Sequence, residues 1–300
     1  MMKAGVVGIG DMGSGLAKNL IASGFSTWGY DPDPHRAEAF AALGGTLCKD
    51  AGEVGRNADA VFVMVMTGAQ AKAVILDEGG LKDTMSGGTI LLTATIKRSE
   101  AEEIGAGLAG SGIALIDSPV SGGFPGAQSG TLTMMASAPE DVLAAARPVM
   151  EAVSATIHHV GTEPGMGQTV KACLQSLIGS MFSATFEASV LAAKAGVDGE
   201  AFLKVVANSS AGCGGVTTAL EAILDGRFEG TGSHINTMHK DLTISMALAE
   251  ELGVPMHTAS SAMQIFYAGR TKYPDGDNWI CTRVIEEIAG AGLRRKGGSA

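Results

Sequence analysis

A glycine motif near the N-terminus has the residue types and spacing that a phosphate-binding turn needs. It lies between an apolar run and a helical pattern and reads Gly8-Ile9-Gly10-Asp11-Met12-Gly13. Gly8 would permit the tight turn, Gly10 would let a pyrophosphate approach the backbone, and Gly13 would let helix and strand pack closely. The amide groups that open the following helix would then point at the phosphates. In a chain with 43 glycines the motif alone is weak evidence, so its neighbours decide its meaning.

Asp31 supplies the second element of a dinucleotide site. It follows the next predicted strand, Thr27–Tyr30, about 20 residues beyond the glycines. A carboxylate at this place accepts hydrogen bonds from ribose hydroxyls and repels a 2′-phosphate, and no arginine follows it before Arg36. We therefore expect NAD as the cofactor, with NADP still possible because one acidic residue does not always exclude the phosphate. The competing interpretation is a strand-turn-helix unit that binds nothing.

A serine and two glycines after a later strand could hold a small carboxylate. The segment reads Asp117-Ser118-Pro119-Val120-Ser121-Gly122-Gly123. Loops at the carboxyl ends of parallel strands are where ligands bind in open α/β sheets. Ser121 offers a hydroxyl, and Gly122 and Gly123 offer unhindered amide groups, which together can form an anion-binding concavity. By composition alone, an ordinary glycine-rich loop is the simpler interpretation.

Lys171 and Gln175 place two polar groups on one face of a predicted apolar helix. Side chains four residues apart are neighbours on a helix surface. Burying a lysine on such a helix is costly unless the amine is paired, neutral or functional, and desolvation would lower its pKa toward the range where it exchanges protons. Lys171 is therefore a candidate for proton transfer. The alternative is a helix-end lysine whose ammonium group extends into solvent.

The first half of the chain alternates short apolar runs with helical patterns, which is typical of a Rossmann-type α/β fold with a doubly wound parallel sheet. Strands are expected at Gly5–Ile9, Thr27–Tyr30, Ala60–Met66, Thr89–Leu92, Ile113–Ile116 and Leu132–Met135. Helices are expected from Gly13 to Ala22, after an N-cap at Asp33 followed by Pro34, from a capping box at Ser99–Glu102, and after Ser137 with Glu140.

The pattern changes near residue 165, where the second half becomes helical throughout. From Gln168 to about Ala195 apolar residues cover nearly every face, so a long central helix is expected to be buried as the core of an all-α domain. Shorter helices are expected at Glu200–Ala207, Thr217–Leu224, Lys240–Leu252, Thr258–Tyr267 and Asn278–Ala289. The predicted organisation is a dinucleotide-binding domain at 1–163, a helical domain at 164–292 and a flexible tail at 293–300.

Composition limits the classes of protein that fit. Of 300 residues, 46% are hydrophobic and 17% are charged, which supplies a large core and excludes disorder of the whole chain. The net charge of −10 disfavours nucleic-acid and membrane-surface binding. The longest uninterrupted apolar stretch, at 60–66, is far below the roughly 18 residues of a spanning helix, and residues 1–10 do not read as a signal peptide. A soluble cytoplasmic protein is expected.

Cysteine and histidine patterns indicate no metal site. The four cysteines are widely spaced with no CxxC pair, and His158-His159 lacks further ligands and is interpreted as an exposed strand end. Cys173 is expected to be a packed thiol, and Met64 and Met66 are expected to lie in the core.

Together the motifs resemble the 3-hydroxyacid (β-hydroxyacid) dehydrogenase family, which includes 3-hydroxyisobutyrate dehydrogenase, tartronate semialdehyde reductase, threonate dehydrogenase and the larger 6-phosphogluconate dehydrogenase. Four segments, in order and at family-like spacing, carry the resemblance over almost the whole chain. They are the glycine motif continuing to Ala17-Lys18-Asn19-Leu20, the segment from Asp117 to Gly123 with Gly130-Thr131-Leu132, Gly165-Met166-Gly167-Gln168 with Lys171, and Lys240-Asp241-Leu242.

The resemblance implies a role for each candidate residue. Lys171 would be the general acid/base at the hydroxyl or carbonyl of C3 of a small 3-hydroxy carboxylate, such as 3-hydroxyisobutyrate, a glycerate or tartronate semialdehyde compound, or threonate. The substrate would be bound by Ser121, Gly122, Gly123, Gln175 and Asp241. NAD, or NADP, would be bound by Gly8, Ile9, Gly10, Asp11, Met12, Gly13, Asp31, Met66, Thr95 and Lys240. The family also implies a homodimer or homotetramer, with no metal and no nucleic-acid or membrane partner.

The chain departs from the family pattern in ways that point to a different substrate. Family members usually carry Asn where this chain has Gln175, although threonate-type members also have Gln. The family's Ser-Thr pair reads Ala94-Thr95, and its Leu-Pro pair reads Met66-Thr67. Ser233 stands where several members place an apolar or aromatic residue near the substrate. We therefore expect a substrate other than 3-hydroxyisobutyrate, with polar substituents.

Two rival functions remain open. An aldehyde or imine reductase could use the same scaffold, although imine reductases usually lack the catalytic lysine, so Lys171 argues against the imine case. A non-catalytic dinucleotide-binding module is an alternative of another class, and the presence of Lys171, Ser121 and Asp241 together disfavours it. His234 and His239, close to Lys240, are further candidates for contact with substrate.

Overall fold

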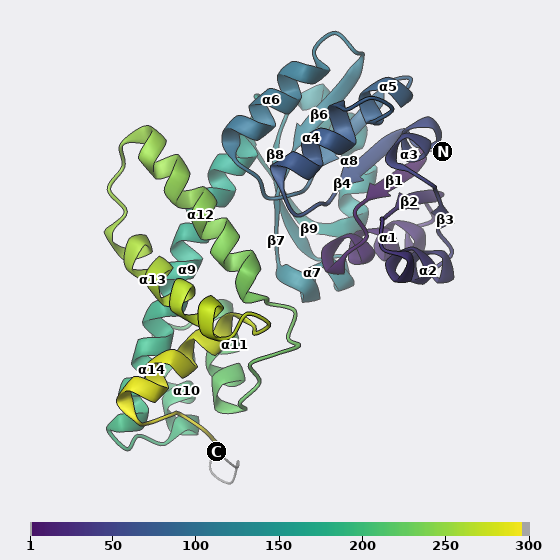
Figure 1. The fold of residues 1–300 in the computed structure, drawn as a ribbon. Coiled ribbons are helices and arrows are strands. Elements are labelled where there is room, and N and C mark those ends of the chain that lie inside the picture. The colour runs from purple at the N-terminus through teal and green to yellow at the C-terminus, as the bar shows by residue number, and fades with distance from the viewer. Residues whose placement is uncertain (1, 296–300) are drawn as a thin grey trace. The chain divides into compact units, whose positions relative to one another are not determined.

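A computed structural model describes residues 2–295. The chain forms two compact units, Met1–Lys171 and Ala172–Ala300. The first is built around a sheet, and in the described part of the second every regular element is a helix (Figure 1). Each unit has a hydrophobic core of its own, so the predicted α/β domain followed by an all-α domain is confirmed.

The sheet of the first unit has nine strands in the order β3-β2-β1-β4-β5-β6-β8-β7, with β9 pairing to β8. The strands are β1 (Ala4–Val7), β2 (Thr27–Tyr30), β3 (Thr46–Leu47), β4 (Ala60–Val63), β5 (Gly88–Leu92), β6 (Ile113–Asp117), β7 (Val120–Ser121), β8 (Leu132–Ser137) and β9 (Ser154–Gly161). Strands β1 to β6 are parallel, whereas β8 is antiparallel to β6 and β7. The strand order reverses between β1 and β4, and ligands bind beyond the carboxyl ends of strands at such a reversal.

Helices cover both faces of this sheet, which is why its strands read as continuous apolar runs. Side chains alternate along a strand, so Val6 and Phe62 lie in one core and Val7 and Val61 in the other. The first core is closed by α1 (Asp11–Ala22), α2 (Pro34–Ala42), α7 (Gly123–Ser129) and α8 (Glu140–Val153). The second is closed by α3 (Ala51–Asn57), α4 (Gly68–Leu76), α5 (Leu81–Thr84) and α6 (Arg98–Leu108).

Two predicted helices are present, but the residues expected to cap them are wrong. Helix α6 begins at Arg98, ahead of the predicted capping box, and the Glu100 carboxylate accepts the amide hydrogen of Lys97 at 2.9 Å. Ser137 does not cap α8; it lies in β8, and its hydroxyl donates to the carbonyl oxygen of Glu163 at 2.6 Å.

The helical unit packs around buried aromatic side chains. Its elements are α9 (Met166–Lys194), which begins in the first unit, α10 (Gly199–Ala207), α11 (Gly214–Leu224), α12 (Ile235–Leu252), α13 (His257–Lys272), a 3-10 turn at Asn278–Ile280 and α14 (Cys281–Ala289). The rings of Phe182 and Trp279 meet edge-on with centroids 5.1 Å apart, and Phe186 lies 6.3 Å from Phe266. These rings join α9 to α13 and to the 3-10 turn.

The units divide after Lys171, inside α9, whereas the predicted domain boundary at 163 lies in the loop before this helix. The first turn of α9 is bonded to the sheet unit, because the side-chain amide of Gln168 donates to the Ala94 carbonyl oxygen at 3.1 Å. At the other end, Leu293 is 2% exposed. The start of the predicted tail at 293–300 is therefore packed, and its residues 296–300 lie outside the described ones.

Helix α9 is not buried on every face, contrary to the expectation from its composition. Leu177 and Leu191 are 66% and 71% exposed, because the other described helices cover only part of α9. Within residues 2–295, α9 is the one helix long and apolar enough to cross a membrane, and 44% of its most apolar window is buried inside the chain. A core helix of a soluble protein can have the same length and composition.

Helices α1 and α7 approach each other closely at Gly15. A Cβ on Gly15 would lie 2.5 Å from the carbonyl carbon and oxygen of Ala127. Asn19, one turn further along α1, donates from Nδ2 to the same carbonyl oxygen at 2.8 Å. The absence of a side chain at Gly15 therefore sets the distance between the two helices.

Replacement of Gly15 by Ala is expected to destabilise the sheet unit even though alanine is the better helix former. The new methyl group would overlap the Ala127 backbone, so we expect a loss of about 1 to 3 kcal/mol in the free energy of unfolding. Gly214→Ala in α11 is the matched control, because a Cβ there meets nothing within 4 Å. Urea unfolding measures both variants, and equal stabilities would contradict the packing role of Gly15.

Candidate active site

The glycine motif forms the turn between β1 and α1. Gly8 has a φ of +88°, and a Cβ there would lie 2.3 Å from the Met64 carbonyl oxygen. A Cβ on Gly13 would lie 1.9 Å from the carbonyl oxygen of Gly8. Both positions require glycine, because the chain takes a left-handed conformation at the first and the helix touches the strand end at the second.

The first turn of α1 can receive a pyrophosphate. Gly10 is the N-cap of α1, and no side chain within residues 2–295 caps this helix start. The atoms closest to a Cβ on Gly10 belong to the Arg36 guanidinium, at 3.5 Å, so the backbone is open on this side. The amide groups of Asp11, Met12 and Gly13 begin the helix, where N–H groups lack intrahelical partners and favour negative charge. The residues present therefore fit a bound dinucleotide.

Asp31 follows β2 and directs its carboxylate at the glycine turn. Its Oδ2 accepts the amide hydrogen of Ile9 at 2.7 Å, and its Oδ1 accepts that of Asp33 at 2.9 Å. Each oxygen keeps acceptor capacity that a ribose hydroxyl can use. The Arg36 guanidinium lies 3.9 Å from Asp31 and 3.7 Å from Asp33, which places a positive charge close to the acidic group. The sequence alone did not show this proximity.

Ser121, Gly122 and Gly123 lie where β7 passes into α7. Gly122 and Gly123 have φ values of +128° and +59°, in the left-handed region that favours glycine. Gln128 of α7 reaches α1, where its Nε2 donates to the carbonyl oxygen of Asp11 at 3.3 Å. Because α1 follows the glycine turn and α7 follows the serine-glycine loop, the packing of these helices fixes the position of one loop relative to the other.

Lys171 is buried in the second turn of α9, with 6% of its surface exposed. This burial contradicts the alternative in which its ammonium group extends into solvent. Lys171 belongs to the same unit as the glycine turn and the loop at 121–123. One unit therefore carries the acid/base candidate, the carboxylate loop and the dinucleotide turn.

Asp117, at the end of β6, is a buried carboxylate that the sequence analysis treated only as part of the loop. Its Oδ2 accepts amide hydrogens from Gly165 at 2.8 Å and Gln168 at 3.3 Å, and its Oδ1 accepts one from the Gln168 side chain at 2.8 Å. Burial raises the pKa of Asp117 from 3.8 to about 6, and these hydrogen bonds oppose the rise. At neutral pH the group is therefore a charged acceptor at the start of α9.

Gln175, Lys240 and Asp241 come together between α9 and α12 of the helical unit. The Gln175 side-chain amide donates to Asp241 Oδ2 at 2.5 Å. Lys240 Nζ lies 3.0 Å from Asp241 Oδ1 as an ion pair without hydrogen-bond alignment. Ser245 donates to the carbonyl oxygens of Asp241 at 3.0 Å and Ala172 at 2.8 Å, which joins the two helices. The result is a buried pair of an amide and a carboxylate.

Two expectations about burial are wrong. Met66 was expected in the core but is 55% exposed, because β4 ends at Val63 and Met66 lies in the following loop, where its amide donates to Gln70 Oε1 at 3.0 Å. Met64 packs partly buried against the core. Cys173 is exposed rather than packed, because it lies on a face of α9 that the described helices leave uncovered.

Ser233, His234 and His239 have structural contacts within the helical unit. The Ser233 hydroxyl accepts a hydrogen bond from Asn278 Nδ2 at 2.8 Å. His234 is the N-cap of α12. His239 lies beside Arg270, and burial together with the Arg270 charge lowers its pKa. Contact of these three residues with substrate stays a prediction.

The predicted site residues fall into two groups. The sheet unit carries Gly8, Ile9, Gly10, Asp11, Met12, Gly13, Asp31, Met66, Thr95, Ser121, Gly122, Gly123 and Lys171, and the helical unit carries Gln175, Lys240 and Asp241. Sequence reasoning did not single out Asn19 or Gln168, although both lie in quoted motifs. Within residues 2–295 no group of three or more His, Cys, Asp or Glu side chains could hold a metal ion.

Comparison with known protein families covers nearly the entire chain. Residues 3–161 match the NAD binding domain of 6-phosphogluconate dehydrogenase. Residues 165–285 match the NAD-binding domain of NADP-dependent 3-hydroxyisobutyrate dehydrogenase. The two matches meet at the loop that precedes α9.

Individual relatives match over their full length. An L-threonate dehydrogenase of Escherichia coli O6:H1 is 34% identical over 293 residues, 97% of each chain. The solved structure of a 3-hydroxyisobutyrate dehydrogenase from Salmonella typhimurium is 30% identical with a TM-score of 0.86, covering 95% of this chain and 100% of that one. A 3-hydroxyisobutyrate dehydrogenase of Mycobacterium tuberculosis, solved with L-serine, is 28% identical with a TM-score of 0.84, covering 95% of this chain and 99% of that one.

The buried Asp117 carboxylate predicts a pH-dependent stability. Because its pKa is about 6 in the folded chain and 3.8 when unperturbed, the folded state binds the proton more tightly, and the free energy of unfolding should fall as pH rises from about 4 to 6. The fall should be at most about 3 kcal/mol. Asp117→Asn lacks this titration, so the difference between variant and parent, measured by urea unfolding at several pH values, should change across that window. Parallel curves would contradict the assignment.

Proposed function

The chain belongs to the 3-hydroxyacid dehydrogenase family, and on that premise we propose which residues carry its reaction and which hydroxy acid it uses. The protein is an NAD(P)-dependent oxidoreductase that transfers a hydride between a nicotinamide cofactor and a small 3-hydroxy carboxylate. The observation that carries the residue assignment is the burial of Lys171 in the unit that also holds the glycine turn and the serine-glycine loop.

In oxidation, Lys171 accepts the proton of the substrate hydroxyl, and in reduction it returns that proton to the carbonyl oxygen. The nicotinamide, when bound, takes up or supplies the hydride at C3. Ser121, Gly122 and Gly123 bind the substrate carboxylate through a hydroxyl and unhindered amides, which orients the carbon that reacts.

NAD is the proposed preferred cofactor. The Asp31 carboxylate disfavours a 2′-phosphate, and this supports NAD over NADP. Arg36, 3.9 Å from Asp31, weakens the repulsion without removing it, because Asp33 shares its charge. Met66 and Thr95, which follow β4 and β5, are proposed to line the nicotinamide side, and Lys240 is proposed as a further cofactor contact.

The proposed substrate is a hydroxy acid with further hydroxyl groups, such as L-threonate. The Gln175 side-chain nitrogen is committed to Asp241, so the amide oxygen is left to accept a hydrogen from a substrate hydroxyl. The methyl group of 3-hydroxyisobutyrate cannot donate a hydrogen bond to this oxygen. The names of the relatives include both compounds, so this choice rests on the polarity of the Gln175 environment.

An imine reductase and a non-catalytic module are weaker candidates, because imine reductases of this scaffold usually lack the lysine and a non-catalytic module leaves the buried Lys171 without a role. An aldehyde reductase would use Lys171 as its proton donor, and it differs from the proposed enzyme only in needing no substrate carboxylate. The protein is proposed to be soluble and to lie in the cytoplasm. The length of α9 does not argue otherwise, since nearly half of its most apolar window is buried.

A homo-oligomer is supported by an exposed apolar seam along α9. The seam consists of Leu177, Met181, Ala184, Ala188 and Leu191, spaced by four and three residues in alternation. This is the spacing of a seam at which two helices pack. The pattern has leucines at both ends and Met181, Ala184 and Ala188 between them. An antiparallel copy fits this pattern, because the leucines pack against each other, Met181 packs against Ala188, and Ala184 allows close approach where the helices cross.

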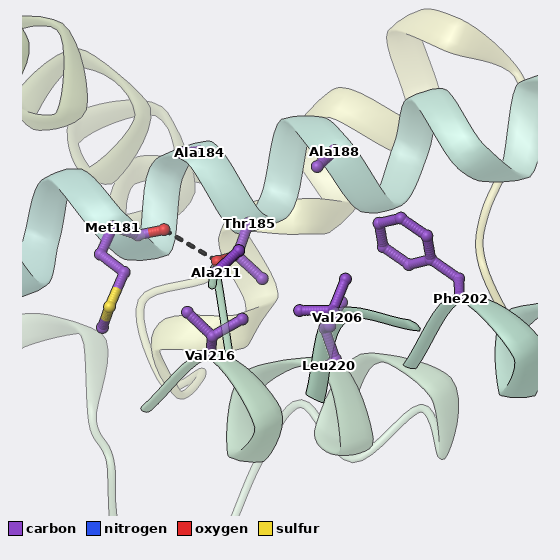
Figure 2. A pocket seen from close by; sticks show the side chains of 9 residues that line it. All are labelled: Met181, Ala184, Thr185, Ala188, Phe202, Val206, Ala211, Val216 and Leu220. Atoms are coloured by element: carbon purple, nitrogen blue, oxygen red, sulfur yellow. Dashed lines mark hydrogen bonds between the residues drawn. The ribbon is translucent and has the colours of Figure 1, made fainter. Parts of the chain in front are cut away.

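The seam continues into an apolar groove of about 380 Å³ between α9, α10 and α11 (Figure 2). Met181, Ala184 and Ala188 form one wall, and Phe202 and Val206 contribute to the other. A second copy of this chain is the proposed occupant, because it would cover the seam and fill the groove with apolar side chains of its own.

Lys171→Ala is expected to lower kcat by about 10²- to 10⁴-fold, because the proton acceptor is removed. The Kd for NADH, measured by fluorescence titration, should be unchanged. The assay is NADH absorbance on a panel of hydroxy acids that includes L-threonate and 3-hydroxyisobutyrate. A variant with near-normal turnover would rule out the role of Lys171, and a parent enzyme that oxidises none of the acids would favour the reductase or non-catalytic alternative.

Gln175→Leu is expected to reduce kcat/KM for L-threonate by about 10- to 100-fold, because a buried hydrogen bond to substrate is lost. The value for 3-hydroxyisobutyrate should change less. Gln175→Asn keeps the amide on a shorter chain and serves as the conservative control. An equal loss for both acids would show that Gln175 does not select the polar one.

Leu177→Glu combined with Leu191→Glu is expected to dissociate the oligomer, because charges would be buried in the seam. Ile288→Glu on α14 is the control, since Ile288 is 85% exposed and lies outside the seam. Sedimentation velocity compares the three proteins. A monomeric parent, or an assembly that survives the double substitution, would refute the proposed interface.

A further inference from the structure

Gln168 is a buried residue to which the proposed reaction has so far given no role. It lies in the first turn of α9 and is 1% exposed. Its side-chain oxygen accepts the amide hydrogen of Ile96 at 3.0 Å. Its side-chain nitrogen donates to the Ala94 carbonyl oxygen at 3.1 Å and to Asp117 Oδ1 at 2.8 Å. The oxygen and the nitrogen of this one amide group are therefore both hydrogen-bonded, and the three bonds reach two separate segments of the sheet unit.

Asp117 binds the same helix start through the backbone. Its Oδ2 accepts the amide hydrogens of Gly165 and Gln168, which lie at the N-terminus of α9, where amides lack partners within the helix. The carboxylate also complements the positive end of the helix dipole. Asp117 and Gln168 therefore form one hydrogen-bonded clamp, which we call the α9 clamp.

The α9 clamp joins three of the segments to which the proposed function assigns a task. Ala94 and Ile96 flank Thr95, the proposed nicotinamide contact, and Asp117 begins the loop that leads to Ser121. Lys171 follows Gln168 by three residues, so the two side chains are neighbours on the helix surface. Rotation or sliding of α9 would break the clamp and move Lys171 at the same time.

We propose that Gln168 and Asp117 are positioning residues that fix Lys171 relative to the loops at Thr95 and Ser121. This inference rests on the proposed acid/base role of Lys171. The energetic reason is that a displacement of about 1 Å between reacting groups can cost on the order of 10²-fold in rate. A buried amide held at three points restrains the helix more tightly than apolar packing, which tolerates small shifts.

Gln168→Met is the first test, because methionine has a similar volume and cannot make the three hydrogen bonds. We expect kcat to fall by about 10- to 100-fold, while KM for the hydroxy acid and the Kd for NADH stay close to those of the parent. The primary deuterium isotope effect on kcat, with deuterium at the oxidised carbon, should rise because the chemical step has slowed. Gln264→Met on α13 is the matched control, since Gln264 is exposed.

The second test exchanges the amide at 168 and the carboxylate at 117. It tests the proposal even if Gln168→Met does not fold. Gln168→Glu alone places a second carboxylate beside that of Asp117, and the repulsion between the two charges should inactivate the enzyme. When it is combined with Asp117→Asn, the new amide at 117 can donate to the new carboxylate at 168, and the amide oxygen can still accept the helix amides. The bond to the Ala94 carbonyl oxygen stays lost, so the recovery should be partial. We expect the double variant to recover at least about tenfold in kcat over Gln168→Glu alone, an energy of about 1.4 kcal/mol.

Three results would each overturn the proposal: a Gln168→Met enzyme with kcat within about twofold of the parent, a loss of kcat with an unchanged isotope effect, or a double variant no better than Gln168→Glu. The second result would mean that a smaller fraction of enzyme is folded and that the clamp is structural only. Lys171→Ala is measured in parallel, because retained activity there would refute the acid/base role itself and not the clamp.

Discussion

A charged group buried at the end of β6 is the constraint on which the start of α9 depends. The Asp117 carboxylate is stable away from water only if donors surround it. The start of a helix has the complementary need, since its first amides lack acceptors. The bonds from Gly165 and Gln168 to Asp117 satisfy both. The long helix therefore begins directly beside the sheet edge, and Lys171 lies one turn further along at a position that the sheet determines.

The sheet unit and its dinucleotide turn could be predicted because local patterns specify them. Strands covered on both faces are apolar throughout, so β1 and β4 stand out in the sequence, and the glycines between β1 and α1 follow from steric need at Gly8 and Gly13. The start of α2 is equally local, since Asp33 caps it and Pro34 opens it. The helical second half was recognised from long apolar patterns without turn signals.

Contacts between residues distant in the sequence could not be predicted in the same way. The α9 clamp joins Gln168 to Ile96 and Asp117, and nothing in the local sequence names these partners. Arg36 approaches Asp31 only because of the direction that α2 takes. The exposure of one face of α9 depends on which helices cover it, and composition does not report that. Local patterns thus identified the candidate site residues but not the distant side chains that contact them.

The distribution of site residues over the two units suggests why one scaffold serves several hydroxy acids. The chemistry common to such substrates needs a dinucleotide turn, a carboxylate loop and an acid/base, and the residues proposed for all three lie in the sheet unit together with the α9 clamp. The groups proposed to distinguish one acid from another, above all Gln175 held by Asp241, lie in the helical unit. On this proposal, a change of the Gln175 amide would alter which substituents are accepted and would leave the strand ends and the helix start unchanged. On the proposed assignment, substrate preference can therefore diverge without disturbing the buried Asp117 carboxylate at the start of α9.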